Sequence, residues 1–349
     1  MKRIRENLLI WYDAHARVLP WRGIHDPYRT WVSETMLQQT RVETVMGYYA
    51  RFLERFPTVQ ALAEAPQDDV LKLWEGLGYY SRARNLHKGA QQVVNDYGGE
   101  IPREVDALRR ISGIGPYTAG AIASIAFDQP VPAVDGNVIR VTSRLMGVRE
   151  NVGIPSVRRR IEQLAGALVS PERPGDFNQA MMDLGATICV PGTPSCERCP
   201  LYGRCDACRE GDAEELPVLP RKSPPRQLEY DVCLIFSGDR VLMRQRTETM
   251  LHGLWVYPML EGHAARHQLP AAVRRLSRLP VTEIEWAGEA RHVFTHQVWN
   301  MRLLIMQTKE TQAAAGWRFV TLEEMDTLAV PTAVKAAAAL VRKRLRPHI

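Results

Sequence analysis

Residues 111–119 read Ile-Ser-Gly-Ile-Gly-Pro-Tyr-Thr-Ala and lie between two apolar segments with helical spacing. Gly113 and Gly115 allow the backbone to turn tightly and to approach another molecule closely. Pro116 suits the first position of the next helix, whose free amides could hold a phosphate. The stretch therefore predicts a helix-hairpin-helix that contacts a nucleic-acid backbone with little sequence specificity. An ordinary tight turn between helices would explain the same residues, because short glycine motifs are weak signals.

The sequence around this turn has helical periodicity and no convincing strand alternation as far as residue 205. Helices are expected at 2–15, 28–47, 67–75, 82–96, 103–111, 116–126, 135–146, 155–169 and 174–188. Many of these segments are separated by Pro or Gly. The N-terminal part of the chain is therefore expected to be all-α.

The pattern changes between residues 210 and 228, where Glu-Glu-Leu-Pro-Val-Leu-Pro is followed by Arg-Lys-Ser-Pro-Pro-Arg. This charged, proline-rich stretch is interpreted as a linker. Short strands are expected beyond it at 230–236, 240–244, 253–258, 291–295 and 298–307. A second domain of mixed class is therefore expected from residue 229, and 349 residues are enough for two cores.

The composition is that of a globular protein, with 45% hydrophobic and 24% charged residues. No apolar run approaches the roughly 18 residues of a membrane span, and the apolar stretch 8–12 is too short for a signal peptide. The net charge of +6 permits nucleic-acid binding without proving it. Basic patches at 158–160 and 342–346 could contribute, although solvated helix faces have the same pattern. An intracellular protein without a membrane role is expected.

Four cysteines, Cys189, Cys196, Cys199 and Cys205, follow the spacing C-x6-C-x2-C-x5-C. In a reducing compartment, closely spaced cysteines are interpreted as metal ligands in preference to disulfides, and four of them match the ligand count of one [4Fe-4S] cluster. Zinc is the alternative, because 196/199 and 205/208 form two CxxC pairs. Only five residues separate these pairs, fewer than a zinc knuckle normally uses, and Cys189 is left without a role. The spacing favours iron-sulfur and leaves zinc open.

Asp135 stands before Gly136 and Asn137 at the start of an apolar helical segment, which is first of all the pattern of an N-cap. The order of hairpin, Asp135 and four cysteines, however, resembles the helix-hairpin-helix DNA glycosylases. Within that superfamily the chain is similar, over nearly its whole length, to the adenine DNA glycosylases that remove adenine paired with 8-oxoguanine. The further segments that carry this similarity are Leu19-Pro-Trp-Arg22, Asp26-Pro-Tyr28, Trp31-Val-Ser-Glu-Thr-Met-Leu-Gln-Gln-Thr40 and Trp74-Glu-Gly-Leu-Gly-Tyr-Tyr-Ser81.

The resemblance implies a multidomain chain with an all-α helix-hairpin-helix glycosylase over residues 1–209. A six-helix barrel module over about 25–130 would carry the hairpin, and a lobe from 1–24 and 131–209 would hold a [4Fe-4S] cluster on the four cysteines, with Cys208 outside the ligand set. Residues 210–228 would be the linker, and 229–349 an α+β, Nudix-like domain. Ser112 departs from many relatives, which have Pro or Lys there, but the glycines of the turn remain.

The resemblance also implies the chemistry. Asp135, ionised, would stabilise the electron-poor sugar, and Glu34, protonated, would donate its proton to N7 of adenine. Apolar neighbours make burial of Glu34 plausible, and burial raises a carboxyl pKa, although sequence alone would favour a surface helix residue. Tyr117 replaces the lysine with which endonuclease III-type relatives form a Schiff base, so no efficient lyase activity is expected. Tyr117 would hydrogen bond near Asp135, and Asn137 would orient the Asp135 carboxylate or the attacking water.

The target base must leave the duplex to reach these groups. By resemblance, the adenine pocket is lined by Leu19, Arg22 and Gln179. Gln39 and Tyr79 would occupy the gap beside 8-oxoguanine, and Gly113 and Gly115 would contact the DNA backbone. There are structural alternatives to these roles. Leu19 and Tyr79 could be core residues, and Gln39 and Gln179 could be exposed helix residues.

The C-terminal segments 241–246 and 253–258 resemble strands of a nucleoside-triphosphate-binding Nudix sheet. A Nudix hydrolase needs clustered glutamates for Mg²⁺, whereas the segment 271–279 offers three arginines. Recognition without hydrolysis is therefore expected, with contacts to 8-oxoguanine from Phe294, Thr295 and His296.

The predicted function is base-excision repair of adenine opposite 8-oxoguanine or guanine in double-stranded DNA, by a monomer in the bacterial cytoplasm, associated with the nucleoid. A glycosylase/lyase for oxidised pyrimidines is opposed by Tyr117 and by the C-terminal domain. A non-enzymatic sensor of DNA damage or redox state is opposed by the pair Glu34 and Asp135.

Overall fold

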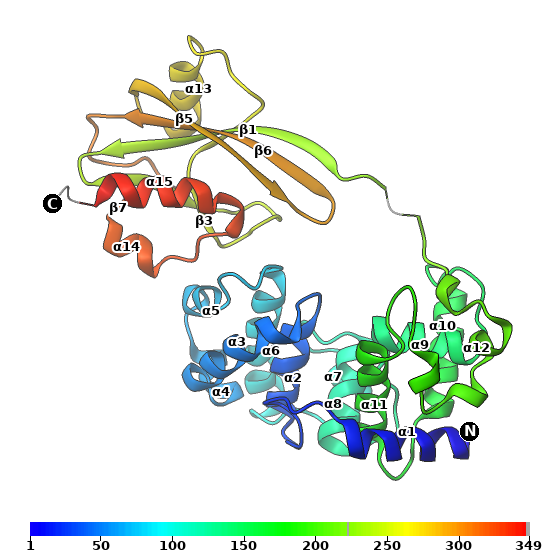
Figure 1. The fold of residues 1–349 in the computed structure, drawn as a ribbon. Helices are drawn as coiled ribbons and strands as arrows, with labels where there is room; N and C mark the ends of the chain where they lie inside the picture. The colour runs from blue at the N-terminus through cyan, green and yellow to red at the C-terminus, as the bar shows by residue number, and fades with distance from the viewer. Residues whose placement is uncertain (222, 347–349) are drawn as a thin grey trace. The chain divides into compact units, whose positions relative to one another are not determined.

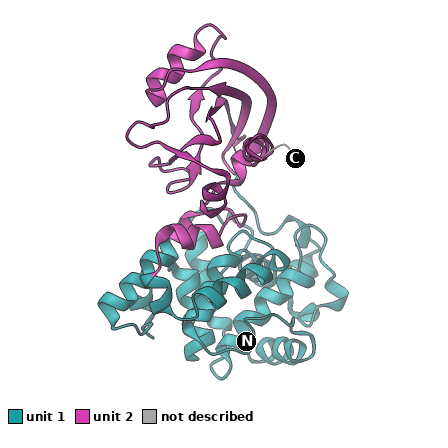
Figure 2. Ribbon diagram, turned by 90° about the vertical axis from the view of Figure 1, so that its left-hand side faces the viewer, with its two compact units in different colours: residues 1–64, 85–222 teal, residues 65–84, 223–349 magenta. Residues whose placement is uncertain are grey.

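The computed structural model describes residues 1–221 and 223–346. Lys222 of the predicted linker and residues 347–349 of the predicted second domain lie outside the described residues. The chain forms two compact units, one of residues 1–64 and 85–222 and the other of residues 65–84 and 223–349 (Figure 2). The domain boundaries at 209 and 229 stay a prediction.

Helices make up the regular structure of the described residues before 222 (Figure 1). The α-helices are α1 (Lys2–His15), α2 (Pro27–Leu37), α3 (Val42–Arg55), α4 (Val59–Glu64), α5 (Gln67–Leu73), α6 (Ser81–Tyr97), α7 (Val105–Leu108), α8 (Pro116–Phe127), α9 (Gly136–Leu145), α10 (Pro155–Leu168), α11 (Pro174–Thr187) and α12 (Asp206–Glu210). The all-α prediction for this part is confirmed.

One predicted helix, 28–47, is wrong because the structure divides it into α2 and α3. Gln39, between them, has a φ of +57°. A left-handed residue cannot continue a right-handed helix, so the chain must break there. Apolar periodicity continues through the break and conceals it from sequence reasoning. The short helices α4 and α12 were not predicted either.

The predicted helix-hairpin-helix is formed by α7, the turn at 111–115 and α8. Gly113 has a φ of +85°, and a Cβ there would lie 3.0 Å from the Cβ of Asn85. Both the backbone conformation and the close approach therefore require glycine. Gly115 caps α8, Pro116 is its first residue, and residues 118–125 of α8 are buried. The hairpin is thus anchored by a helix in the core.

The second unit contains a mixed sheet. Its strands are β1 (Arg226–Ser237), β2 (Arg240–Gln245), β3 (Trp255–Val256), β4 (Met259–Glu261), β5 (Thr282–Val293), β6 (Gln297–Gln307) and β7 (Arg318–Val320). The order is β3-β2-β1-β6-β5, with β4 also paired to β1 and β7 to β2. The central pair β1 and β6 is parallel, and the other pairs are antiparallel.

Residues 231–236 of β1 are buried on both faces, and helices cover these faces (Figure 1). Val232 and Leu234 join the core that includes α15 (Lys335–Leu345), whereas Cys233 and Ile235 join the core that includes α13 (Leu269–Ser277). A short helix, α14 (Leu322–Thr327), precedes α15. This mixed sheet with its helices confirms the α+β class.

The predicted strand 291–295 overlaps only the end of β5, which starts at Thr282. Register shifts between Thr282 and Glu285 and between Trp286 and Gly288 interrupt its alternation. Sequence periodicity cannot follow a strand across such bulges. No helix in residues 1–221 or 223–346 has the length and apolar character to cross a bilayer.

Candidate active site

Glu34 lies on α2 and is 6% exposed. The Tyr117 hydroxyl donates a hydrogen bond to its Oε2 and lies 3.9 Å from the Met182 sulfur. Burial raises the pKa of Glu34, and the charge of Asp135 adds to the rise, while the Tyr117 hydrogen bond and the Arg22 cation oppose it. Burial also raises the pKa of Tyr117, so its hydroxyl keeps its proton. Tyr117 thus bonds to Glu34, although the sequence-based expectation placed its hydrogen bond near Asp135.

Asp135 is the N-cap of α9. Its Oδ1 accepts a 2.7 Å hydrogen bond from the Val138 amide, and its Oδ2 accepts a 2.8 Å bond from Asn137 Nδ2. Burial raises the pKa of Asp135, and these hydrogen bonds oppose the rise because they favour the charged form. The ionised form of Asp135 is therefore stabilised by more hydrogen bonds than the ionised form of Glu34, which accepts the one from Tyr117. Two carboxyls with unequal environments can take opposite protonation states.

Both carboxyls line one cavity of about 970 Å³ in the first unit. Its lining includes most residues predicted for the site: Leu19, Arg22, Glu34, Gln39, Gly113, Gly115, Tyr117, Asp135 and Asn137. Gln179 is buried on α11 and is not one of the lining residues. Met182, one helical turn further, lines the cavity in its place. Trp21 lines it too and was not predicted for the site, and Arg158 was predicted only as part of a basic patch. The i, i+3 spacing from Gln179 was the only signal for Met182.

A polar chain extends from Asp135 to the cysteine segment. The guanidinium of Arg140 donates to Asn137 Oδ1 at 2.9 Å, to the Gly185 carbonyl at 2.7 Å and to the Cys189 carbonyl at 2.8 Å. Asn137 in turn holds the Asp135 carboxylate. The catalytic candidate and the first of the four cysteines are therefore joined by two side chains.

The four cysteines and Cys208 line one small cavity of about 30 Å³. Arg144 donates to the Cys189 sulfur at 3.3 Å, and the Cys205 thiol donates to the Arg144 carbonyl at 3.4 Å. Burial raises the pKa of Cys196 to about 11 and the pKa of Cys199 to about 12. Cys208 hydrogen bonds to Cys196, so the two CxxC pairs of the zinc alternative lie side by side.

Within the described residues, no three His, Cys, Asp or Glu side chains converge as a single metal ion requires. A [4Fe-4S] cluster instead holds several metal atoms between its ligands, so its thiolates stand around a shared space. The thiols around this cavity fit such a cluster, and because Cys208 borders the cavity as well, the choice between iron-sulfur and zinc stays a prediction.

Comparison with known proteins supports the same family. Residues 32–170 match the model of the HhH-GPD superfamily base excision DNA repair protein, and residues 231–340 match the NUDIX domain. The adenine DNA glycosylase of Mus musculus is 38% identical, over 95% of this chain and 76% of the mouse protein. This chain belongs to the adenine DNA glycosylases. The adenine DNA glycosylase of Schizosaccharomyces pombe is 44% identical over 85% of this chain and 80% of its own length.

The glycosylase fold is also found among solved structures. A thermostable thymine-DNA glycosylase is 30% identical, with a TM-score of 0.55 over 60% of this chain and 96% of its own. Endonuclease III in a non-covalent DNA complex is 25% identical, with a TM-score of 0.51 over 60% of this chain and 97% of its own. Each covers about as much of this chain as its helical part.

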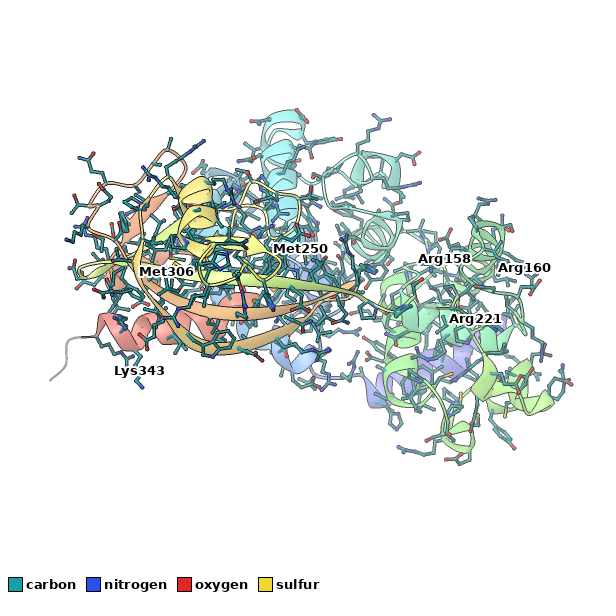
Figure 3. All side chains as sticks on the ribbon, turned by 90° about the horizontal axis from the view of Figure 1, so that it is seen from above. Arg158, Arg160, Arg221, Met250, Met306 and Lys343 are labelled. Atoms are coloured by element: carbon teal, nitrogen blue, oxygen red, sulfur yellow. The ribbon has the colours of Figure 1, made fainter. Side chains whose placement is uncertain are left out.

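The second unit of this adenine DNA glycosylase contains a cavity of about 650 Å³. Phe294, Thr295 and His296 line it, together with Tyr79 and with Met250, which is labelled in Figure 3. The Tyr79 and Thr295 hydroxyls are 2.9 Å apart and share a hydrogen bond. Four of the residues predicted to read the opposite base therefore share this cavity, whereas Gln39 lines the first one.

Two arginines of the basic patch at 158–160, labelled in Figure 3, have different surroundings. Arg158 lines the first cavity, while Arg160 pairs with Glu150 at 2.6 Å. In the C-terminal patch, Arg342 pairs with Asp326. Of these three arginines, only Arg158 therefore lines the first cavity.

Proposed function

We propose that this enzyme hydrolyses the N-glycosidic bond of adenine paired with 8-oxoguanine or guanine in double-stranded DNA and leaves an abasic site. The observation that carries the proposal is one cavity lined by Glu34, Tyr117 and Asp135. Family membership supports adenine as the leaving base. Release of adenine from a duplex in a single turnover is the direct test. Action as a monomer in the bacterial cytoplasm stays a prediction.

Protonated Glu34 activates the leaving group. Adenine departs poorly as an anion, so a proton must reach N7 as the glycosidic bond breaks. The hydrogen bond from Tyr117 occupies Oε2 of Glu34, which leaves Oε1 to carry that proton. Burial supports this state because it raises the pKa of the carboxyl.

Ionised Asp135 balances the charge that develops on the sugar. The bonding electrons leave with the base, so C1′ becomes electron-poor and is stabilised by the adjacent carboxylate, or bonds to it transiently. The Val138 amide and Asn137 fix this carboxylate before the reaction starts. Water then adds to C1′ and passes a proton to the Glu34 carboxylate, which restores its protonated form and completes the hydrolysis.

We propose that the enzyme lacks efficient lyase activity. Strand cleavage through a Schiff base needs an amine nucleophile at C1′. Among the described residues that line the first cavity, none is a lysine. Tyr117 occupies the hairpin position of the lysine in endonuclease III-type relatives and is engaged with Glu34.

Replacing Tyr117 with Lys is expected to introduce lyase activity. The new amine would lie at the start of α8 beside Asp135, where it can attack C1′ of the sugar. Borohydride should then trap a covalent adduct with DNA, and strands should break without alkali. Tyr117→Phe is the matched control and should give neither product. High-yield trapping with the wild type would contradict the proposal.

We propose that the cavity with Tyr79 and Thr295 reads 8-oxoguanine. The hydrogen-bonded hydroxyls of Tyr79 and Thr295 supply a donor and an acceptor. Phe294 adds an aromatic ring, whose centroid lies 4.9 Å from that of Trp299. The C-terminal domain would thus recognise the damaged partner while the first cavity holds adenine.

Thr295→Ala is expected to reduce the preference for 8-oxoguanine over guanine by roughly fivefold, the scale of one net hydrogen bond. Thr295→Ser keeps the hydroxyl and should keep the preference. The measurement is the ratio of adenine release rates from the two duplexes. Equal ratios for wild type and Thr295→Ala would remove Thr295 from base recognition.

We propose that Cys189, Cys196, Cys199 and Cys205 hold a [4Fe-4S] cluster. Four thiolates around one cavity suit such a group. When bound, the cluster would crosslink the segment after α11 and could exchange electrons. Arg144 would donate a hydrogen bond to the Cys189 ligand.

Cys189→Ser is expected to lose most of the protein-bound iron and sulfide, because it removes a ligand. Cys208→Ser is the matched control and should retain both, since Cys208 is outside the proposed set. Elemental analysis and the visible absorption of the purified proteins measure this. The opposite result, iron or zinc retained by Cys189→Ser and lost by Cys208→Ser, would favour the two CxxC pairs as the metal site.

A further inference from the structure

A carboxylate outside the predicted site, Asp183 on α11, is almost completely buried. Its side chain is 1% exposed. It accepts hydrogen bonds from Arg17 Nε at 2.8 Å, Arg17 Nη2 at 2.6 Å and Arg22 Nη2 at 2.9 Å, and from the Arg17 amide at 3.3 Å. Three of these bonds end on Oδ1 and one on Oδ2, so both oxygens of Asp183 are engaged by two residues of one loop.

That loop, residues 16–26, connects α1 to α2 and forms one wall of the first cavity. Leu19, Trp21 and Arg22 all line the cavity from it. On the other side of Asp183, its helix neighbours Met182 and Ala186 line the same cavity. Asp183 therefore ties two walls of the cavity together without lining it.

The Arg22 guanidinium is held at both ends. Nη2 donates to Asp183, and Nη1 donates to the Tyr12 hydroxyl at 2.8 Å. The side chain is 13% exposed and acts electrostatically on Glu34. Two arginines against one carboxylate leave one positive charge in excess. Arg22 carries this charge near Glu34, where it lowers the pKa of that carboxyl against the effect of burial, so the position of Arg22 affects how firmly Glu34 holds its proton.

We propose that Asp183 is a positioning residue that fixes Arg22 and its loop against α11 and so sets the adenine pocket. The inference rests on the proposed function, because it assigns Arg22 to that pocket. Misplacing a positioned group by about 1 Å can slow a reaction about 100-fold. The effect should fall on the chemical step, while binding of the duplex changes little.

A double-mutant cycle tests this with Asp183→Asn, Arg22→Ala and the double variant. Each single variant is expected to slow single-turnover release of adenine about 100-fold. If Asp183 acts through Arg22, the double variant is no slower than Arg22→Ala. Multiplied effects in the double variant, or an unchanged rate with Asp183→Asn, would overturn the proposal. Duplex affinity, measured in parallel, should change less than about threefold if only positioning is lost.

Asp13→Asn is the matched control. Asp13 on α1 also binds the start of α11, because it accepts hydrogen bonds of 2.6 and 3.0 Å from its N-cap residue Arg173, but it does not line the cavity. Asp13→Asn should leave the rate unchanged, which separates pocket positioning from general attachment of α1.

Arg17→Gln is the second variant, used if Asp183→Asn does not fold, because it leaves one Arg paired with Asp183. It should slow release about tenfold, and a wild-type rate would overturn the proposal. Failure of the wild type to release adenine would instead reject the proposed function.

Discussion

Asp135→Asn is expected to lower the single-turnover rate of adenine release by about 10³-fold or more, the scale of losing a preorganised charge. The amide cannot balance the positive charge that develops at C1′. Asn is also a good N-cap, so α9 should still start at Gly136 and the protein should fold. The measurement is base release from a duplex with excess enzyme, together with the melting temperature.

Asp128→Asn provides the control for this substitution. Asp128 ends α8 in the left-handed region, with a φ of +53°, where Asn is equally suited. Its rate should stay within about twofold of wild type, the range expected of a surface change. If Asp135→Asn stayed folded and retained the wild-type rate, Asp135 would be only the N-cap that its sequence pattern first suggests.

Glu34→Gln is expected to lower the rate by about 10³-fold, within the range of general acid catalysis. It should also change the pH profile. Because protonated Glu34 is the active form, activity is lost as pH rises through its raised pKa. Because ionised Asp135 is required, activity is lost as pH falls through the raised pKa of Asp135. Glu34→Gln should remove the alkaline limb and leave the acid limb.

Tyr117→Phe supplies the complementary test of Glu34. The hydrogen bond from Tyr117 favours the charged carboxylate and lowers the pKa of Glu34, so its removal should move the alkaline limb to higher pH. An alkaline limb that persists in Glu34→Gln would assign the proton to another group.

Much of this architecture could be predicted because its signals are local. The glycines of the hairpin and the N-cap pattern at Asp135 each lie within a few residues, and each forms the expected local structure. The cysteine spacing is also local, and the metal that it indicates stays a prediction. Apolar periodicity found the long helices for the same reason. It failed at Gln39 and in β5, where a left-handed residue and strand bulges interrupt the pattern.

The contacts that complete the site are long-range and had no sequence signal. Tyr117 and Glu34 are 83 residues apart, and Arg17 and Asp183 are 166 apart. Which side chains meet at such separations depends on helix packing, which residue spacing does not encode. The resemblance supplied Glu34 as a candidate, but neither the Asp183 anchor nor the Arg140 link to Cys189 followed from it.

The most direct test of the central claim is one single-turnover reaction on a duplex with a single adenine opposite 8-oxoguanine. The products are resolved with and without alkali, for wild type and Asp135→Asn. Wild type should release adenine and leave a strand that breaks only in alkali, and Asp135→Asn should leave the strand intact. Strand breakage without alkali, or no adenine release by folded, metal-loaded wild type, would contradict a monofunctional adenine glycosylase.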